Sequence, residues 1–331
     1  MKDATMAQMT PDVDVVKNAV LLACRAPSVH NSQPWYWVYD ERGLELFLDS
    51  GRRLRSADPS GREAIISCGA VLDHLRVAMA VAGWQANVDR FPNPNNRDHL
   101  ASLQFSPVNF VTDAARQRAE AILCRRTDRL PLGRPTYWSS FEPVLRSYVD
   151  DSVAMLDVLE DDARPELARA SQLTEALRRD DASYQAELQW WTSPFTLYEG
   201  VPPEALASDS ERQRVDVARD FPARSLVDRR ADIAVDWSKI LVLSTVEDTR
   251  EDALGCGEAL SSVLLECTMA GMATCPLTHL LELPESRDIV RNLISQDRQP
   301  QVLIRVGIAP PADELPAATP RRPLDEVLQI R

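Results

Sequence analysis

The chain has 331 residues, of which 44% are hydrophobic and 26% charged, and its formal net charge is −13 at pH 7. This length allows one large domain or two, with a sizeable core. This acidic balance disfavours DNA, RNA and anionic membrane surfaces as partners, because binding to nucleic acid normally needs a basic face. No run approaches about 18 apolar residues, and residues 1–10 are polar. We therefore expect a cytoplasmic protein without a membrane span or an export signal.

The cysteines and histidines do not have the spacing of metal ligands. The six cysteines include no Cys-x-x-Cys pair, and most lie in apolar helical surroundings, so we interpret them as reduced thiols. The four histidines are scattered along the chain. We predict no metal site. No Ser/His/Asp arrangement indicates a nucleophile, and we assign no catalytic residue.

The first informative segment follows a predicted amphipathic helix and precedes an aromatic strand at residues 36–39. Residues 26–35 read Ala-Pro-Ser-Val-His-Asn-Ser-Gln-Pro-Trp. Proline ends the helix, and the polar side chains can both donate and accept hydrogen bonds beside the flat surfaces of Trp35 and Trp37. This combination suits a flat heteroaromatic ligand with polar edges, and the alternative is a well-packed turn. The candidate residues are Pro27, Ser28, Asn31 and Gln33.

Residues 62–83 and 250–271 form an ungapped repeat with an offset of 188. Seven of the 22 aligned positions are identical, and they include an in-register Cys-Gly pair. Both copies are rich in alanine and apolar around most of their circumference, which predicts two buried helices. Gly83 and Gly271 fall where a helix would end. The alternative is a chance likeness between two core helices.

Strand-like runs follow both copies of the repeat. They are residues 88–91 and 100–105 after the first copy, and residues 272–278 and 301–306 after the second. A short helix is expected near 284–294. The sequence therefore predicts two related α+β halves, residues 1–110 and 111–331, joined near 107–112.

Two basic clusters lie in the second half. Residues 125–129 read Arg-Arg-Thr-Asp-Arg and follow a helix predicted over 114–124, and the second cluster is the Arg-Arg pair at 321–322. Guanidinium forks and a threonine hydroxyl are good donors to a phosphate. The alternative is a solvated run of surface charge. The candidate residues are Arg125, Arg126, Thr127, Arg129, Arg321 and Arg322.

An irregular segment interrupts the second half. A long amphipathic helix is predicted over about 164–190, and an irregular stretch rich in tryptophan and proline follows at about 190–236. The next regular element is a buried strand predicted at 239–243. Long irregular loops in compact proteins are usually functional or mobile. This lid-like insertion can cover a ligand, or it can be a surface excursion anchored by its tryptophans.

In their order along the chain, these motifs resemble those of the nitroreductase superfamily of FMN-dependent oxidoreductases. The Pro-Ser-x-x-Asn-x-Gln-Pro-Trp run is similar to the N-terminal motif of that superfamily. The cluster at 125–129 resembles its phosphate motif, with Thr127 where serine is usual. A glycine after the last strand, a proline-rich stretch and Pro-Arg-Arg-Pro-Leu resemble its closing segment. From about residue 13 to 331 the chain is similar to the Acg-type, dormancy-associated, nitroreductase-like proteins of actinobacteria.

The resemblance implies a nitroreductase-like α+β fold, duplicated so that one chain mimics the usual homodimer and remains a monomer. It implies FMN as the cofactor, in one complete site per chain. The N-terminal loop would lie against the ring. The residues that would converge on the FMN phosphate are Arg125, Arg126, Thr127, Arg129 and one or both of Arg321 and Arg322. Beside flavin N5 and the pyrimidine edge would lie Pro276, Leu277 and Thr278. For His279 an acid/base role and a hydrogen-bonded structural role stay open, with the structural role favoured.

The function implied is reduction of nitroaromatics or quinones by NAD(P)H, with hydride transfer through flavin N5. The partners would then be NAD(P)H and a small aromatic acceptor. The alternative is a protein that sequesters FMN in a site closed by the insertion, with little or no turnover. A flavin-free structural protein is a third possibility.

Overall fold

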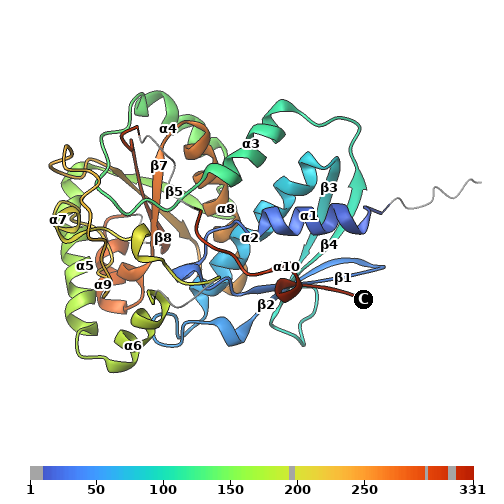
Figure 1. Ribbon diagram of the computed structural model, residues 1–331, viewed down its shortest axis with the longest axis horizontal. Helices are drawn as coiled ribbons and strands as arrows, with labels where there is room; N and C mark the ends of the chain where they lie inside the picture. Colours follow the sequence, from blue (N-terminus) through green and yellow to red (C-terminus); the bar gives the residue numbers. More distant parts are fainter. Residues whose placement is uncertain (1–9, 194–197, 295–296, 312–317) are drawn as a thin grey trace, which may run out of the picture.

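The computed structural model describes residues 10–193, 198–294, 297–311 and 318–331. Two β-sheets flank a central pair of long helices (Figure 1). The first sheet has the order β3-β4-β2-β1-β9, and its strands are β1 (Trp35–Asp40), β2 (Gly43–Leu48), β3 (Trp84–Arg90), β4 (His99–Pro107) and β9 (Leu328–Ile330). β9 comes from the end of the chain and pairs with β1 in parallel, with Trp37 opposite Leu328.

The second sheet repeats the strand order of the first. Its order is β5-β6-β8-β7, and its strands are β5 (Met155–Leu159), β6 (Lys239–Thr245), β7 (Ala273–Leu277) and β8 (Gln299–Gly307). This corresponds strand by strand to β1-β2-β4-β3, and the neighbouring strands within each set of four are antiparallel. The matching strands β2 and β6 even share a shift in pairing register, after Leu46 and Leu243.

The helices form a central layer and an outer layer. The central layer contains α1 (Val13–Ala23), α2 (Arg62–Val81), α3 (Asp113–Cys124) and α8 (Arg250–Met269). On the outer side of the second sheet, α5 (Arg164–Arg178) packs against α9 (Pro284–Arg291). The shorter or more peripheral helices are α4 (Trp138–Ser147), α6 (Ala182–Trp191), α7 (Asp209–Gln213) and α10 (Leu324–Val327).

Most elements predicted from the sequence are confirmed, including both helices of the repeat. Gly83 and Gly271 follow these helices with φ values of 87° and 74°, the left-handed conformation that ends a helix. The single helix predicted over about 164–190 is wrong, because α5 ends at Arg178 and α6 begins at Ala182. Asp181 caps α6: its backbone is extended and its side chain accepts a hydrogen bond from the Tyr184 N–H. A strong N-cap residue in mid-pattern thus divides the helix.

The two helices of the repeat cross where their backbones approach most closely. A Cβ atom on Gly69 would lie 2.8 Å from the Cα of Gly257 and would overlap the carbonyl oxygen of Leu254. One turn further along, Ser261 donates a hydrogen bond of 2.6 Å to the carboxylate of Asp73. Both pairs join positions that are 188 residues apart, so each residue meets its own counterpart in the repeat.

α2 is also the one described helix whose length and composition would allow it to cross a membrane. Of that window, 83% is buried inside the protein, which is the environment of a core helix. Its apolar character therefore follows from its place between α1, α3 and α8.

The sheets differ in how their first two strands are joined. β1 and β2 form a hairpin with a turn at residues 41–42, whereas residues 160–238 lie between β5 and β6. This β5–β6 insertion contains α5, α6 and α7 and includes the irregular stretch expected at about 190–236. Residues 194–197 of that stretch and 312–317 of the proline-rich stretch are outside the described residues.

We predict that Gly69→Ala lowers the free energy of unfolding by about 1–3 kcal/mol, because its methyl group would force α2 and α8 apart. The effect opposes the higher helix propensity of alanine. The matched control is Gly255→Ala in α8, where the new methyl group would meet only a side-chain methyl of Val153. Chemical denaturation of both variants tests this, and an equal or smaller loss for Gly69→Ala would contradict it.

Candidate functional site

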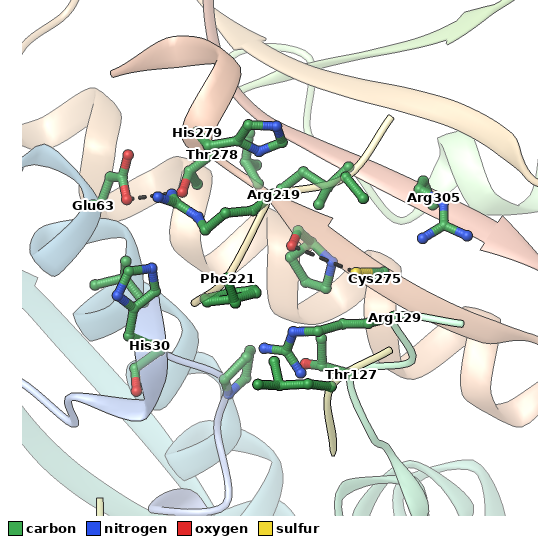
Figure 2. A pocket seen from close by; sticks show the side chains of 18 of the residues that line it. His30, Glu63, Thr127, Arg129, Arg219, Phe221, Cys275, Thr278, His279 and Arg305 are labelled. Carbon is green, nitrogen blue, oxygen red and sulfur yellow. Dashed lines mark hydrogen bonds between the residues drawn. The ribbon is translucent and has the colours of Figure 1, made fainter. Parts of the chain in front are cut away.

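Two adjoining cavities are lined by residues from the first 70 positions of the chain and by residues beyond position 124. The larger cavity encloses about 1010 Å³, part of it open to solvent. The smaller one, here called the arginine cavity, encloses about 440 Å³. Both are lined by Pro27, Ser28, Thr127 and Arg129, so they form one continuous site. Figure 2 shows the larger cavity.

The loop of residues 27–33, here called the motif loop, begins just after α1 and has an unusual backbone. His30, Asn31 and Gln33 have φ values of 47°, 57° and 49°. Such left-handed conformations cost about 1–2 kcal/mol each for residues other than glycine. The loop is held by hydrogen bonds from the Gln33 N–H to Ser28 Oγ (3.0 Å) and from the Val29 N–H to Ser67 Oγ (3.1 Å). Strained backbone that is fixed in this way is typical of functional sites.

The motif loop joins two distant segments of the chain. The Asn31 amide donates to the carbonyl oxygens of Gly200 and Pro320, each at 3.1 Å. The Gln33 amide donates to the carbonyl of Tyr198 (2.7 Å) and accepts from the backbone N–H of Arg322 (2.9 Å). The insertion and the C-terminal tail therefore meet on this loop.

The arginine cavity gathers positive charge without a carboxylate partner. It is lined by five guanidinium groups, those of Arg25, Arg125, Arg126, Arg129 and Arg321. Among the described residues, none of the five has an Asp or Glu oxygen within 4.0 Å. Two buried nitrogens of Arg125, Nε and Nη1, have no hydrogen-bond partner. Burial, reinforced by the charges of Arg126 and Arg25, lowers the pKa of Arg125 to about 10.

Arg321 adds positive charge to the arginine cavity, and its N–H groups bind backbone carbonyls at the end of α1. It donates to the carbonyls of Cys24 (2.8 Å), Arg25 (3.1 Å) and Ala26 (3.2 Å), at the end of α1. A cation is stabilising at the C-terminus of a helix. The tail is thereby fixed beside the cavity. Burial, together with Arg25 and Arg125, holds the pKa of Arg321 well below its ordinary value.

A short pairing with β7 positions the basic residues that follow α3. Thr127 forms an isolated bridge with Thr274, and the Asp128 N–H donates to the Thr274 carbonyl (2.8 Å). This contact places Thr127 and Arg129 beside the end of β7, where Pro276, Leu277 and Thr278 line the larger cavity.

The β5–β6 insertion forms one wall of the larger cavity. Phe221 lies between His30, at 5.7 Å between ring centroids, and the guanidinium of Arg129, at 5.5 Å from the Phe221 ring centroid (Figure 2). Arg219 forms a buried ion pair with Glu282 and donates to the Tyr184 hydroxyl (2.7 Å). The insertion is thus anchored on both sides of the cavity.

Two buried histidines line the larger cavity, and both are neutral. Burial, with the nearby charge of Arg219, lowers the pKa of His30 and His279 well below the ordinary value. Both ring nitrogens of His30 lack a hydrogen-bond partner. In His279, Nε2 lies 2.8 Å from Ser171 Oγ, the arrangement expected for a structural histidine.

Glu63 is the acidic residue of the larger cavity. Its side chain is 1% exposed, and Oε2 accepts a hydrogen bond of 2.8 Å from the Thr278 hydroxyl (Figure 2). Burial raises the pKa of Glu63 to about 8, and the neighbouring carboxylates of Glu282 and Asp58 add to this effect.

The structure brings together most of the residues proposed from the sequence. The candidates that line one or both cavities are Pro27, Ser28, Asn31, Arg125, Arg126, Thr127, Arg129, Pro276, Leu277, Thr278 and Arg321. Gln33 and Arg322 line neither cavity. Gln33 makes the loop contacts given above, and Arg322 forms ion pairs with Asp49 (3.7 Å) and Glu326 (3.3 Å).

Several lining residues are not among the candidates from the sequence, and Arg25, His30, Glu63, Arg219 and Phe221 are the ones that shape the site described above. Arg25 precedes the motif run and His30 belongs to it. Their position beside the motif candidates is the signal that could have identified them. Glu63 is an acidic residue in the first turn of an otherwise apolar helix. Its favourable interaction with the helix dipole explains such a position equally well. Arg219 and Phe221 lie in the irregular insertion, where no periodic pattern predicts a position. Within the described residues, no three His, Cys, Asp or Glu side chains gather as a metal site.

The two cavities favour different parts of a ligand. The arginine cavity is suited to a compact dianion such as a phosphate monoester, because uncompensated guanidinium groups form strong charge-assisted hydrogen bonds with phosphate oxygens. The surface of the larger cavity is mainly apolar, and polar and charged residues interrupt it. A mostly apolar cavity with convergent polar groups can hold a flat organic ring. The shared residues place such a ring directly beside the anion.

Comparison with known proteins identifies the family. No family model matches the chain. It is 64% identical over 321 residues to the uncharacterized protein Rv3127 of Mycobacterium tuberculosis, covering 96% of this chain and 93% of that one. It is 57% identical over 318 residues to a protein of the same organism named "Putative NAD(P)H nitroreductase acg", covering 96% of each chain.

Among solved structures, the chain is similar to the FMN-dependent nitroreductase NfnB from Mycobacterium smegmatis in complex with NADPH. The identity is 18% and the TM-score 0.40, and the match covers 66% of this chain and 99% of that one. The family assignment rests on the full-length sequence relatives, two of which share more than half of their aligned residues with this chain. The chain belongs to the Acg-type family of nitroreductase-like proteins.

Proposed function

We propose that this protein is an FMN-binding flavoprotein that uses NAD(P)H to reduce nitroaromatics or quinones. The observation that carries the proposal is the joined pair of cavities: one presents unpaired arginines, and the other presents apolar walls. The FMN phosphate would occupy the arginine cavity and the isoalloxazine ring the larger one. The name of the Acg relative, which describes an NAD(P)H nitroreductase, supports the same assignment.

The residues present fit this cofactor. Arg125 offers two buried nitrogens without partners, and a phosphate would supply both the acceptors and the negative charge that they lack. Ser28 and Thr127 lie where the cavities meet and can bond to the ribityl chain. Thr278 and the backbone of Pro276 and Leu277 can bond to the polar edge of the ring. Gln33 and Arg322 support this site by fixing the loop and the tail.

When bound, FMN supplies a carrier that accepts and releases hydride at N5. The side chains of this protein would hold the phosphate, fix the plane of the ring and limit the access of water. The neutral His30 and the apolar face of Phe221 bound the space in which a nicotinamide or an acceptor would approach.

One observation favours a second candidate function, the holding of FMN with little or no turnover. Phe221 lies in the wall of the larger cavity, is 8% exposed, and belongs to a segment tied down by the Arg219–Glu282 ion pair. An insertion fixed in this position would restrict stacking of a second ring on the flavin.

We infer that the chain arose by duplication and that its two halves take the place of a homodimer. The matching strand orders, the shared register shift after Leu46 and Leu243, and the contact between Gly69 and Gly257 support this inference. The motif loop occurs only in the first half and the 125–129 cluster only in the second. One site per chain and a monomeric protein follow from this division.

The visible spectrum of the purified protein tests both functions. We expect flavin absorbance bands, with or without added FMN, and anaerobic NADPH or NADH should bleach them if the protein is a reductase. Bands that persist with both nucleotides would support the holding function. Protein that remains colourless after incubation with FMN would contradict both.

We predict that Arg126→Ala weakens FMN binding by about 1.5–3 kcal/mol, the contribution of a hydrogen bond to a charged group. Riboflavin has no phosphate, so its affinity should not change. Titration of both ligands by flavin fluorescence checks this. Arg116→Ala in α3 is the matched control, because Arg116 is exposed and paired with Asp113. Equal losses for FMN and riboflavin would remove Arg126 from the phosphate site.

We predict that Arg125→Met stabilises the ligand-free protein by about 1–3 kcal/mol, because it removes a buried charge that has no counter-ion.

Inorganic phosphate should raise the melting temperature of the native protein at concentrations where chloride does not, and it should have a smaller effect on the Arg125→Met variant. Thermal denaturation in matched salts measures both effects. A less stable variant that phosphate still protects would contradict the proposed role.

A further inference from the structure

Glu63 separates the larger cavity from a second hollow on the other side of it. This hollow, here called the side cavity, encloses about 970 Å³ and is open to solvent. It is lined in part by Asp58, Arg62 and Glu282. Among the described residues, Glu63 is the only one that lines both the larger and the side cavity. Glu63 therefore lies in the wall between the two cavities.

Only one of the two carboxyl oxygens of Glu63 accepts a hydrogen bond. Oε2 accepts the hydrogen bond from Thr278, whereas the buried Oε1 has no hydrogen-bond partner. The nearest cationic group is Arg62, with Nη2 at 3.6 Å from Oε1. Arg62 also donates to the carbonyl and the side chain of Gln301, at 2.8 and 3.0 Å, so it is shared between partners.

The charged groups around Glu63 come from several elements. Asp58 precedes α2, Arg62 belongs to α2, Glu282 follows β7, and Arg219 comes from the insertion. The guanidinium group of Arg219 forms an ion pair with Glu282. Glu63 thus faces two other carboxylates from a buried position, and its pKa is raised to about 8. These surroundings favour the protonated form of Glu63 near pH 7.

We propose that Glu63 is the proton donor of this site and that its proton is restored from water in the side cavity. This inference rests on the proposed reductase function. A quinone that receives a hydride, two electrons and one proton, needs a second proton on oxygen to become a hydroquinone. The O–H bond of Glu63 breaks, the new O–H bond forms on the quinone, and the remaining carboxylate takes a proton from solvent through the side cavity.

The duplicated sequence supplies a matched control for Glu63. Glu251 occupies the same position of the repeat, in the first turn of α8. Its side chain is exposed and lines none of the cavities described above. Glu63→Gln and Glu251→Gln therefore make the same chemical change at equivalent helical positions, one inside the site and one outside.

The first experiment measures melting temperatures of the ligand-free proteins from pH 5 to pH 8.5. The folded protein binds a proton at Glu63 more tightly than the unfolded chain, so this group makes the native protein progressively less stable as the pH rises from about 4.5 to 8. Glutamine does not titrate, so the melting temperature of Glu63→Gln relative to native should increase across this range. The Glu251→Gln difference should be flat. A flat difference for Glu63→Gln would overturn the proposal.

The second experiment follows a single turnover. FMN-loaded protein is reduced with dithionite and mixed with benzoquinone, and reoxidation is recorded against pH. The native rate should fall as the pH rises through 8. Glu63→Gln should be slower by about 10²–10⁴-fold at pH 7, the usual contribution of a general acid, and nearly independent of pH. Glu63→Asp should recover part of the rate.

The outcomes separate the two proposals. Failure to bind FMN, or a reduced flavin that benzoquinone does not reoxidise, would overturn the reductase function itself. Normal FMN binding with equal rates and equal pH profiles in native protein and Glu63→Gln would overturn only the role of Glu63.

Discussion

The close contact between α2 and α8 determines the geometry of the whole molecule. Two helix backbones can approach this closely only where neither residue has a side chain, and Gly69 and Gly257 meet that requirement together. α2 contributes Glu63 and Ile66 to the larger cavity, and α8 contributes Leu260. Both helices at this contact therefore also supply residues that line the larger cavity. The close packing of α2 and α8 in the core in this way influences the shape of the site.

The arginine cavity shows how electrostatics connects stability to binding. Its guanidinium groups repel one another and are partly desolvated, which is unfavourable in any folded protein. A chain with a net charge of −13 has many carboxylates available, yet the described carboxylates lie elsewhere, for example in the pair of Asp236 and Arg305. Five arginines without such partners leave a positive potential in this cavity that the proposed phosphate would neutralise. If the proposed phosphate binds there, it would offset this unfavourable term in the ligand-free protein.

The sequence predicts the regular elements well because their patterns are local. The apolar repeat helices, their terminal glycines and the strands around them can all be recognised from periodicity and composition. The break before Asp181 was missed because α5 and α6 continue one amphipathic pattern. Side chains that depend on tertiary contacts were the least predictable. Gln33 and Arg322 belong to the right segments, but the Gln33 amide binds the backbone of Arg322 and the Arg322 side chain pairs with Asp49 and Glu326. Phe221 reaches the site only because the insertion folds back on the motif loop.

The different surroundings of Glu63 and Glu251 have a genetic consequence. In a homodimer, one codon specifies a residue in both subunits, so any change appears twice and must be tolerated in both places. In a chain that carries both halves, the two positions are inherited separately. One acidic residue can be retained for chemistry in a buried site while its counterpart drifts at the surface. A chain built in this way can specialise one half without altering the other.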